Sequence, residues 1–138
     1  MGHSHENSRP ITAKQQIVLD ALLKSEVPLS AYALLDQLRD DGFRAPLQVY
    51  RALDKLVEGE HVHRLESLNA FVACRHSGCE GDAPQTVIFA ICELCGRVRE
   101  QSDLALHETL SALAKRTNFL MNSSVIELKG QCGDCKSS

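Results

Sequence analysis

Apolar residues recur at helical spacing in three segments of the first half of the chain, and each segment predicts a helix. The segments span residues 11–24, 31–40 and 46–58. Ser30 is a residue type that favours a helix N-cap, and Gly59 is one that ends a helix. The apolar residues that define the spacing are Ile17, Ala21, Leu22, Tyr32, Leu35, Leu38, Val49, Leu53 and Leu56.

Two short strand-like segments follow the third helix, at residues 62–65 and 70–74. Turn-forming residues at positions 67–69 separate them, so together they predict a β-hairpin. Three helices followed by a hairpin is the order of a winged helix, a variant of the helix-turn-helix fold. The first half of the chain is therefore predicted to be a winged-helix module.

The pattern changes in the second half of the chain. Residues 86–92 form a continuous apolar run that predicts a buried strand, and residues 97–101 predict a second strand. Asp103 is suited to cap a helix that continues to about residue 118, and residues 123–128 predict a third strand. The order β-β-α-β makes the chain an α+β protein with two modules. Residues 76–84 contain a stretch rich in Gly, Asp and Pro, which predicts a linker between them.

Composition narrows the classes of function. The 138 residues are 43% hydrophobic, which is enough to bury a core. No apolar run approaches the roughly 20 residues of a membrane span. The start of the chain lacks the apolar centre of a signal peptide, so we expect a cytoplasmic protein with no membrane contact. The net charge of −3 excludes a broadly basic DNA-binding surface, and any DNA contact must come from a local patch.

Four of the six cysteines form two C-x-x-C pairs, Cys92 with Cys95 and Cys132 with Cys135. Four thiolates suit tetrahedral zinc, and cytosolic cysteines more often bind metal than form disulfides. The pairs lie farther apart than in a simple zinc ribbon, so the metal would hold the end of the second module against its start. The alternatives are a redox dithiol, which usually opens a helix after a strand, and free buried cysteines. The glycines expected to supply the tight backbone beside these pairs are Gly96 and Gly133.

A second group of metal-binding residue types flanks the predicted linker. His63 and Cys74 lie on the two hairpin strands, and Glu100 lies near the end of the strand after the first cysteine pair. His76 and Cys79 lie in or beside the linker. Taken singly, such histidines are usually solvated and such cysteines are small core residues. Taken together, their N, S and O donors suit zinc better than manganese or magnesium.

The third predicted helix has a polar face that suits DNA. Gln48, Arg51 and Lys55 fall on one side of it, with Tyr50 beside them, while its apolar residues fall on another side. Arginine pairs bidentately with guanine and glutamine suits adenine, so this face predicts a groove-reading helix. Tyr32, early in the second helix, is a candidate either for DNA contact or for the core. The alternative is an ordinary solvated helix face.

Several of these motifs together resemble the ferric uptake regulator family, from about residue 11 to residue 135. The shared segments are residues 48–53, 62–64 and 89–96, followed by Val98 and Glu100. Within that family the chain is most like the zinc uptake regulator branch. The segments that point to this branch are residues 29–32, 51–54, 62–67 with Asn69, and 125–127.

The resemblance implies a winged-helix DNA-binding domain, a dimerisation domain, and one structural and one regulatory zinc ion per subunit. The four cysteines would hold the structural zinc. The regulatory ligands that the resemblance implies are His63, Cys74 and Glu100, with Cys79 or His76 as the fourth. The fourth ligand position is open because the family usually has a histidine where this chain has Gln85. A second departure lies in the third predicted helix, where the family typically has threonine and this chain has Gln48. The histidine-rich stretch of iron-sensing relatives is missing, which argues against iron.

We therefore expect a zinc-responsive repressor that binds palindromic double-stranded operator DNA as a homodimer and controls zinc-uptake genes. We expect neither enzyme activity nor a small-molecule substrate. One alternative is the same scaffold sensing another divalent metal or peroxide, with Cys74 and Cys79 as a thiol pair. Another is a zinc-ribbon interaction module without a DNA role.

The predicted domains are a disordered lead (1–10), a winged-helix DNA-binding domain (11–75), a hinge (76–84) and a dimerisation and metal-binding domain (85–138).

Overall fold

The computed structural model of the protein describes residues 10–74 and 86–136. The chain divides into two compact units, residues 1–80 and residues 81–138. The predicted hinge at residues 76–84, and all of the predicted lead except Pro10, lie outside the described residues. None of the helices in the described ranges combines the length and the apolar character that a membrane span requires.

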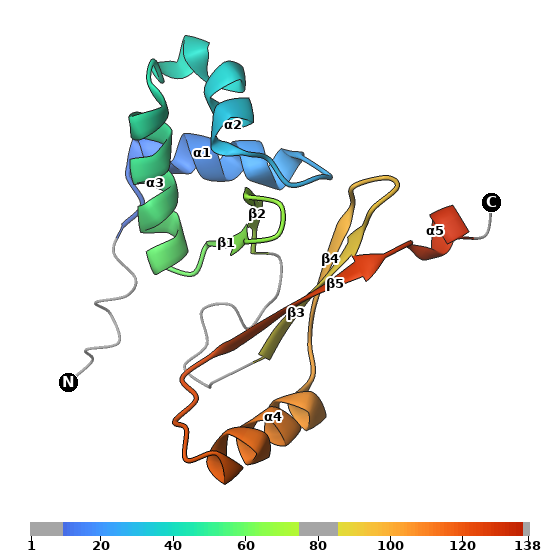
Figure 1. Cartoon of the computed structure of the whole chain (residues 1–138). Helices are drawn as coiled ribbons and strands as arrows, with labels where there is room; N and C mark the ends of the chain where they lie inside the picture. Colours follow the sequence, from blue (N-terminus) through green and yellow to red (C-terminus); the bar gives the residue numbers. More distant parts are fainter. Residues whose placement is uncertain (1–9, 75–85, 137–138) are drawn as a thin grey trace. The chain divides into compact units, whose positions relative to one another are not determined.

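Three α-helices build the first unit (Figure 1). They are α1 (Ala13–Lys24), α2 (Ala31–Gln37) and α3 (Pro46–Glu58). α1 begins at Ala13 rather than at residue 11, because the Thr12 hydroxyl accepts the Gln15 N–H and the Gln15 side chain accepts the Thr12 N–H. α2 ends at Gln37 rather than at residue 40, and the short helix η2 (Arg39–Asp41) follows it. α3 matches its predicted bounds, with Pro46 in its first turn and Gly59 at its C-cap.

A β-hairpin follows the three helices in the first unit. Its strands β1 (Val62–Leu65) and β2 (Ala70–Ala73) pair antiparallel, with Val62 opposite Ala73. The backbones of Leu29 and Phe71 exchange two hydrogen bonds of 3.0 and 2.9 Å, which tie the segment before α2 to the hairpin. The predicted order of helices and hairpin in this module is confirmed, and β2 ends one residue before its predicted end at Cys74.

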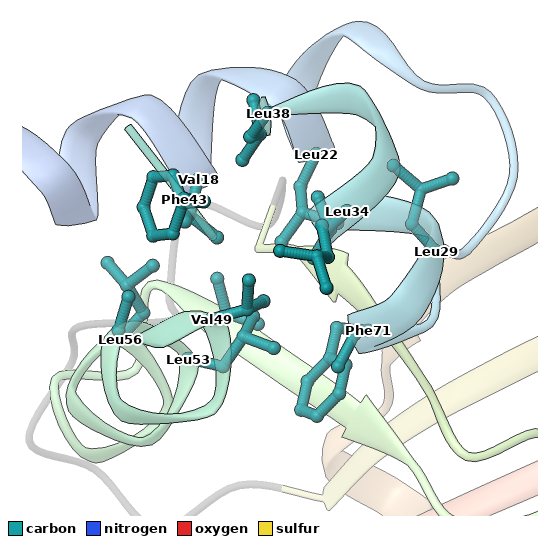
Figure 2. Close-up of a cluster of buried hydrophobic side chains, with 14 of the residues drawn as sticks. Val18, Leu22, Leu29, Leu34, Leu38, Phe43, Val49, Leu53, Leu56 and Phe71 are labelled. Carbon is teal, nitrogen blue, oxygen red and sulfur yellow. The ribbon is translucent and has the colours of Figure 1, made fainter. Parts of the chain in front are cut away.

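The core of the first unit lies between the helices and the hairpin (Figure 2). The predicted apolar face of α3 is confirmed, since Val49, Leu53 and Leu56 are at most 1% exposed. In α2 the predicted stripe was partly wrong, because Leu34 is fully buried whereas Tyr32 is 61% exposed. The buried residues of α2 and its C-cap follow the true helical period of 3.6 residues rather than a step of three. They are Ala31, Leu34, Leu35 and Leu38.

The second unit is a three-stranded sheet with helices. Its elements are β3 (Thr86–Cys92), β4 (Val98–Ser102), α4 (Leu104–Arg116), β5 (Ser124–Gly130) and α5 (Gly133–Lys136). The strand order is β4-β3-β5, with β4 antiparallel and β5 parallel to the central strand β3. The Asp103 carboxylate caps α4 by accepting the Leu106 N–H. The α+β class and the β-β-α-β order are confirmed, whereas α5 was not predicted.

Burial within the second unit is concentrated on its central strand. Phe89 is fully buried and Ile88, Ile91 and Cys92 are at most 8% exposed. In contrast, α4 has no buried residue. The large apolar residues that α4, β5 and the segment between them leave exposed are Leu104, Leu113, Phe119, Leu120, Val125 and Leu128. A single copy of this unit therefore leaves much of its apolar surface in contact with water.

The packing of α3 generates a prediction for stability. Leu53→Ala removes a fully buried side chain and should lower the free energy of unfolding of the first unit by about 2–5 kcal/mol. Leu47 lies on the same helix and is 57% exposed, so Leu47→Ala is the matched control and should change it by less than about 1 kcal/mol. Urea denaturation followed by far-UV circular dichroism measures both. Equal destabilisation by the two substitutions would contradict this account of the core.

Candidate metal centre

The sheet of the second unit brings the two cysteine pairs together. Parallel pairing places Cys92, the last residue of β3, beside Gly130, the last residue of β5. The Glu93 N–H donates to the Gly130 carbonyl at 2.8 Å and extends this pairing past the strand end. Cys132 follows two residues later, so the second pair reaches the first. All four sulfur atoms lie within 4.8 Å of one another.

Backbone geometry orients the first pair toward this cluster. Gly96 has a φ of 81°, which favours glycine, and its N–H donates to the Cys92 carbonyl at 3.0 Å. The N–H groups of Cys95 and Cys132 both point at the Cys92 sulfur from 3.4 Å. The tight turn predicted from Gly96 is therefore present.

The second pair is built differently from the prediction. Gly133 begins helix α5 and is not among the glycines with positive φ. A Cβ atom there would meet nothing within 4 Å. The Lys136 N–H donates to the Cys132 carbonyl at 2.9 Å, so one helical turn holds this pair. The prediction that Gly133 supplies special backbone freedom was wrong, because helical backbone suits any L-residue.

The four sulfurs fit a tetrahedral metal ion. Zinc–sulfur bonds of about 2.3 Å in a tetrahedron place the sulfurs about 3.8 Å apart. The sulfurs of Cys95 and Cys132 are 3.8 Å apart, and none of the four cysteines forms a disulfide. Four thiolate ligands complete a zinc shell and leave no open position for a substrate, so this set suits a structural ion rather than a catalytic one.

Two of the four thiols differ strongly in proton affinity. The backbone N–H groups of Cys95 and Cys132 lower the pKa of the Cys92 thiol to about 5, although burial opposes the shift. Hydrogen bonds with the sulfurs of Cys132 and Cys92 raise the pKa of the Cys135 thiol to about 12. At neutral pH without metal, Cys92 is therefore a thiolate and Cys135 is a thiol that must lose its proton to bind zinc.

The second predicted group of ligands is only partly described. His63 on β1 and Cys74, directly after β2, are both half-buried, and their ligand atoms lie within 4.8 Å of each other. Cys74 is disulfide-bonded in this structure, so its sulfur must be reduced before it can bind a metal ion. The Cys74 N–H donates to the His61 carbonyl at 2.8 Å, which holds Cys74 beside β1. Glu100 belongs to the second unit, where it is half-buried on β4 opposite Phe89. The other candidates, His76 and Cys79, and the altered position Gln85 lie outside the described residues.

The predicted DNA-contacting residues divide into exposed and half-buried groups. Tyr32, Arg51 and Lys55 are exposed, whereas Tyr50 is half-buried and packs against the core. Gln48 is half-buried and has a role that was not predicted. Its side-chain oxygen accepts the backbone N–H groups of two residues that precede α3. Glutamine at the third position of a helix is the sequence signal for such a cap.

Comparison with known proteins identifies the family. No family model matches the chain. The chain is 36% identical over 127 residues to the zinc uptake regulation protein of Escherichia coli (strain K12). This alignment covers 91% of this chain and 72% of that protein. The chain belongs to the ferric uptake regulator family, in its zinc uptake regulator branch. A ferric uptake regulation protein of Campylobacter upsaliensis is 26% identical over 133 residues, covering 94% of this chain and 82% of that protein.

Solved structures of the zinc uptake regulator branch have the same fold. Holo XcZur is 38% identical with a TM-score of 0.81, covering 93% of this chain and 87% of that one. A zinc uptake regulator complexed with zinc and DNA is 32% identical with a TM-score of 0.85, covering 96% of this chain and 87% of that one. The resemblance predicted from the motifs is therefore confirmed.

Removal of one cysteine tests the metal centre. Cys132→Ser should abolish the tightly held zinc and loosen the second unit, because metal-binding free energy contributes to folding. Cys74→Ser removes a cysteine outside the four-sulfur cluster and should retain that zinc. Elemental analysis after mild chelation measures zinc, and hydrogen exchange of β3 and β5 amides reports the loosening. Retention of zinc and of amide protection in Cys132→Ser would refute a four-cysteine site.

The unequal thiols generate a prediction about pH. At pH 7, zinc binding by the metal-free protein should release fewer protons than the four that four ordinary thiols would give up, because the pKa of Cys92 is about 5. Cys135, with a pKa of about 12, should supply one of the protons that are released. Calorimetric titration at pH 7 in two buffers of different ionisation enthalpy counts them. Release of nearly four protons would mean that backbone N–H groups do not stabilise a thiolate at Cys92.

Proposed function

We propose that this chain is a zinc-responsive transcriptional repressor that binds palindromic operator DNA as a dimer and controls zinc-uptake genes. The observation that carries the proposal is the similarity over nearly the whole chain to a zinc uptake regulator complexed with zinc and DNA, with a TM-score of 0.85. The proposed activity is binding rather than catalysis, in line with relatives that are named as regulation proteins.

The exposed face of α3 is the proposed DNA-reading surface. The helix buries its apolar residues in the first unit and leaves Arg51 and Lys55 exposed. A recognition helix in the major groove reads bases with side chains near its N-terminus, and arginine is suited to guanine. Tyr32 is exposed on α2 and is a further candidate contact. We expect Tyr50 to support this face rather than to contact bases itself, because it packs partly against the core.

Dimerisation is proposed through the second unit. Its helix α4 buries no residue, and Leu104 and Leu120 are 71% and 83% exposed. Covering such apolar side chains with a second copy is favourable by about 25 cal/mol per Å² of buried area. The chain carries a net charge of −3, so we expect the winged-helix unit of one subunit to make few contacts with DNA phosphates. Two winged-helix units related by a two-fold axis double these contacts and match the symmetry of a palindrome.

Zinc is proposed to act at two sites in each subunit. The four-cysteine centre would hold the structural ion. His63, Cys74 and Glu100, with Cys79 or His76, are proposed to hold the regulatory ion. The His63 and Cys74 ligand atoms lie within 4.8 Å of each other, which supports this set once the disulfide of Cys74 is reduced to a thiolate. Because the proposed ligands come from both units, bound zinc would restrict the motion of one unit against the other and reduce the ordering cost of DNA binding.

The experiment that tests this function measures operator binding as a function of zinc. After mild chelation the full chain should retain one zinc per subunit and bind an enriched palindromic DNA weakly. Restoring zinc should raise its affinity for that DNA about 5–150-fold. Cys74→Ser should keep the retained zinc but lose this recovery. Fluorescence anisotropy at fixed salt gives the affinities, and iron, manganese and peroxide are tested in parallel.

Two outcomes would count against the proposal. Zinc-independent affinity of the intact chain would remove the regulatory role, and a response to iron or peroxide instead of zinc would favour the other sensing functions. Arg51→Ala should abolish specific binding, whereas Arg39→Ala, on the short helix η2 outside both α3 and the proposed dimer surface, is the matched control and should preserve it. Equal effects of the two arginine substitutions would exclude α3 as the reading helix.

A further inference from the structure

The Gln48 side chain is held in one orientation at the start of α3. Its Oε1 atom accepts the backbone N–H of Arg44 at 2.6 Å and the backbone N–H of Ala45 at 3.2 Å. Both partners are donors, so the carboxamide oxygen and not its nitrogen must face them. The side chain thereby satisfies backbone groups next to the helix N-terminus, where intrahelical partners are missing. Gln48 is thus a structural part of the turn that leads into α3.

This cap determines what remains available for DNA. Glutamine reads adenine bidentately by accepting from N6 and donating to N7, which requires both its oxygen and its nitrogen. In Gln48 the oxygen is already committed to two backbone donors. The Nε2 group forms no hydrogen bond with residues 10–74 or 86–136. It therefore has two N–H donors and no acceptor to offer to a base.

The position of Gln48 matches that of a base-reading residue. It is the third residue of α3, and residues near the N-terminus of a recognition helix contact base edges. Arg51 lies three residues further along the same helix, on the same side. A donor at this place meets two acceptors at guanine, O6 and N7, and one at thymine, O4. Adenine presents its N7 acceptor beside a competing N6 donor, and cytosine presents an N4 donor.

We infer that Gln48 reads one base of each half-site purely as a hydrogen-bond donor and selects guanine there rather than adenine. The inference rests on the proposed DNA-binding function and adds a specificity determinant to it. Turning the amide over to read adenine would place the NH₂ group against the backbone N–H groups of Arg44 and Ala45. The same side chain that starts the helix therefore sets the base preference.

The test compares wild type with Gln48→Glu in the zinc-loaded full chain. A carboxylate keeps the oxygen that caps α3 but removes the donor, and an acceptor favours cytosine N4 or adenine N6. DNA is first selected from a random library, and each base of the enriched half-site is then replaced in competition binding at fixed salt. Wild type should prefer guanine over adenine by about 10-fold at one position. Gln48→Glu should reverse that preference and leave the other positions unchanged.

A second variant separates base reading from helix capping. Gln48→Met has a similar length but neither donor nor acceptor, so it should bind all four bases at that position with affinities within about 3-fold of one another. Circular dichroism and zinc content check that both variants are folded. A wild-type preference for adenine, or an unchanged base preference at every position in both folded variants, would overturn the inference alone. Absence of any sequence-specific binding by wild type would instead defeat the proposed function, and the inference with it.

Discussion

The parallel pairing of β3 with β5 is the interaction on which the second unit depends. Parallel neighbours cannot be joined by a tight turn, so the chain leaves β3 through β4 and α4 before it returns. The return in register places Cys92 beside Gly130 and delivers Cys132 to the first cysteine pair. A metal at the four sulfurs would in turn hold the strand ends together. Strand pairing and metal ligation would therefore both hold the ends of β3 and β5 together.

Local signals in the sequence predicted most of the elements, because they act within a few residues. The bounds of β1 and β3 follow directly from apolar runs flanked by turn residues. The helix ends were less accurate where side-chain caps decide them, as Thr12 does for α1. Helix α5 was missed because its four residues are too few to display a hydrophobic period. Strand partners were not predictable, since the pairing of β3 with β5 depends on contacts about 40 residues apart, beyond the reach of local pattern.

The sites show the same division between local chemistry and folded geometry. Two C-x-x-C pairs identified the four-cysteine cluster, but only the structure shows that a helical turn, not Gly133, shapes the second pair. The donor chemistry of His63 and Cys74 was visible in the sequence, whereas their approach depends on the register of the hairpin. Gln48 was interpreted from its side-chain type as a reader of adenine. Its hydrogen bonds to the backbone change that interpretation, because capping and base reading draw on the same oxygen.

The spacing of the cysteine pairs also bears on how the protein is made. The helices and hairpin of the first unit pack against one another within residues 10–74, so this unit can fold while translation continues. Cys92 emerges 40 residues before Cys132. At about 5–20 residues per second, a ribosome needs about 2–8 seconds to cover that interval. During it the nascent chain presents half of a thiol site to the reductants, oxidants and metal carriers of its surroundings, before β5 exists to complete it.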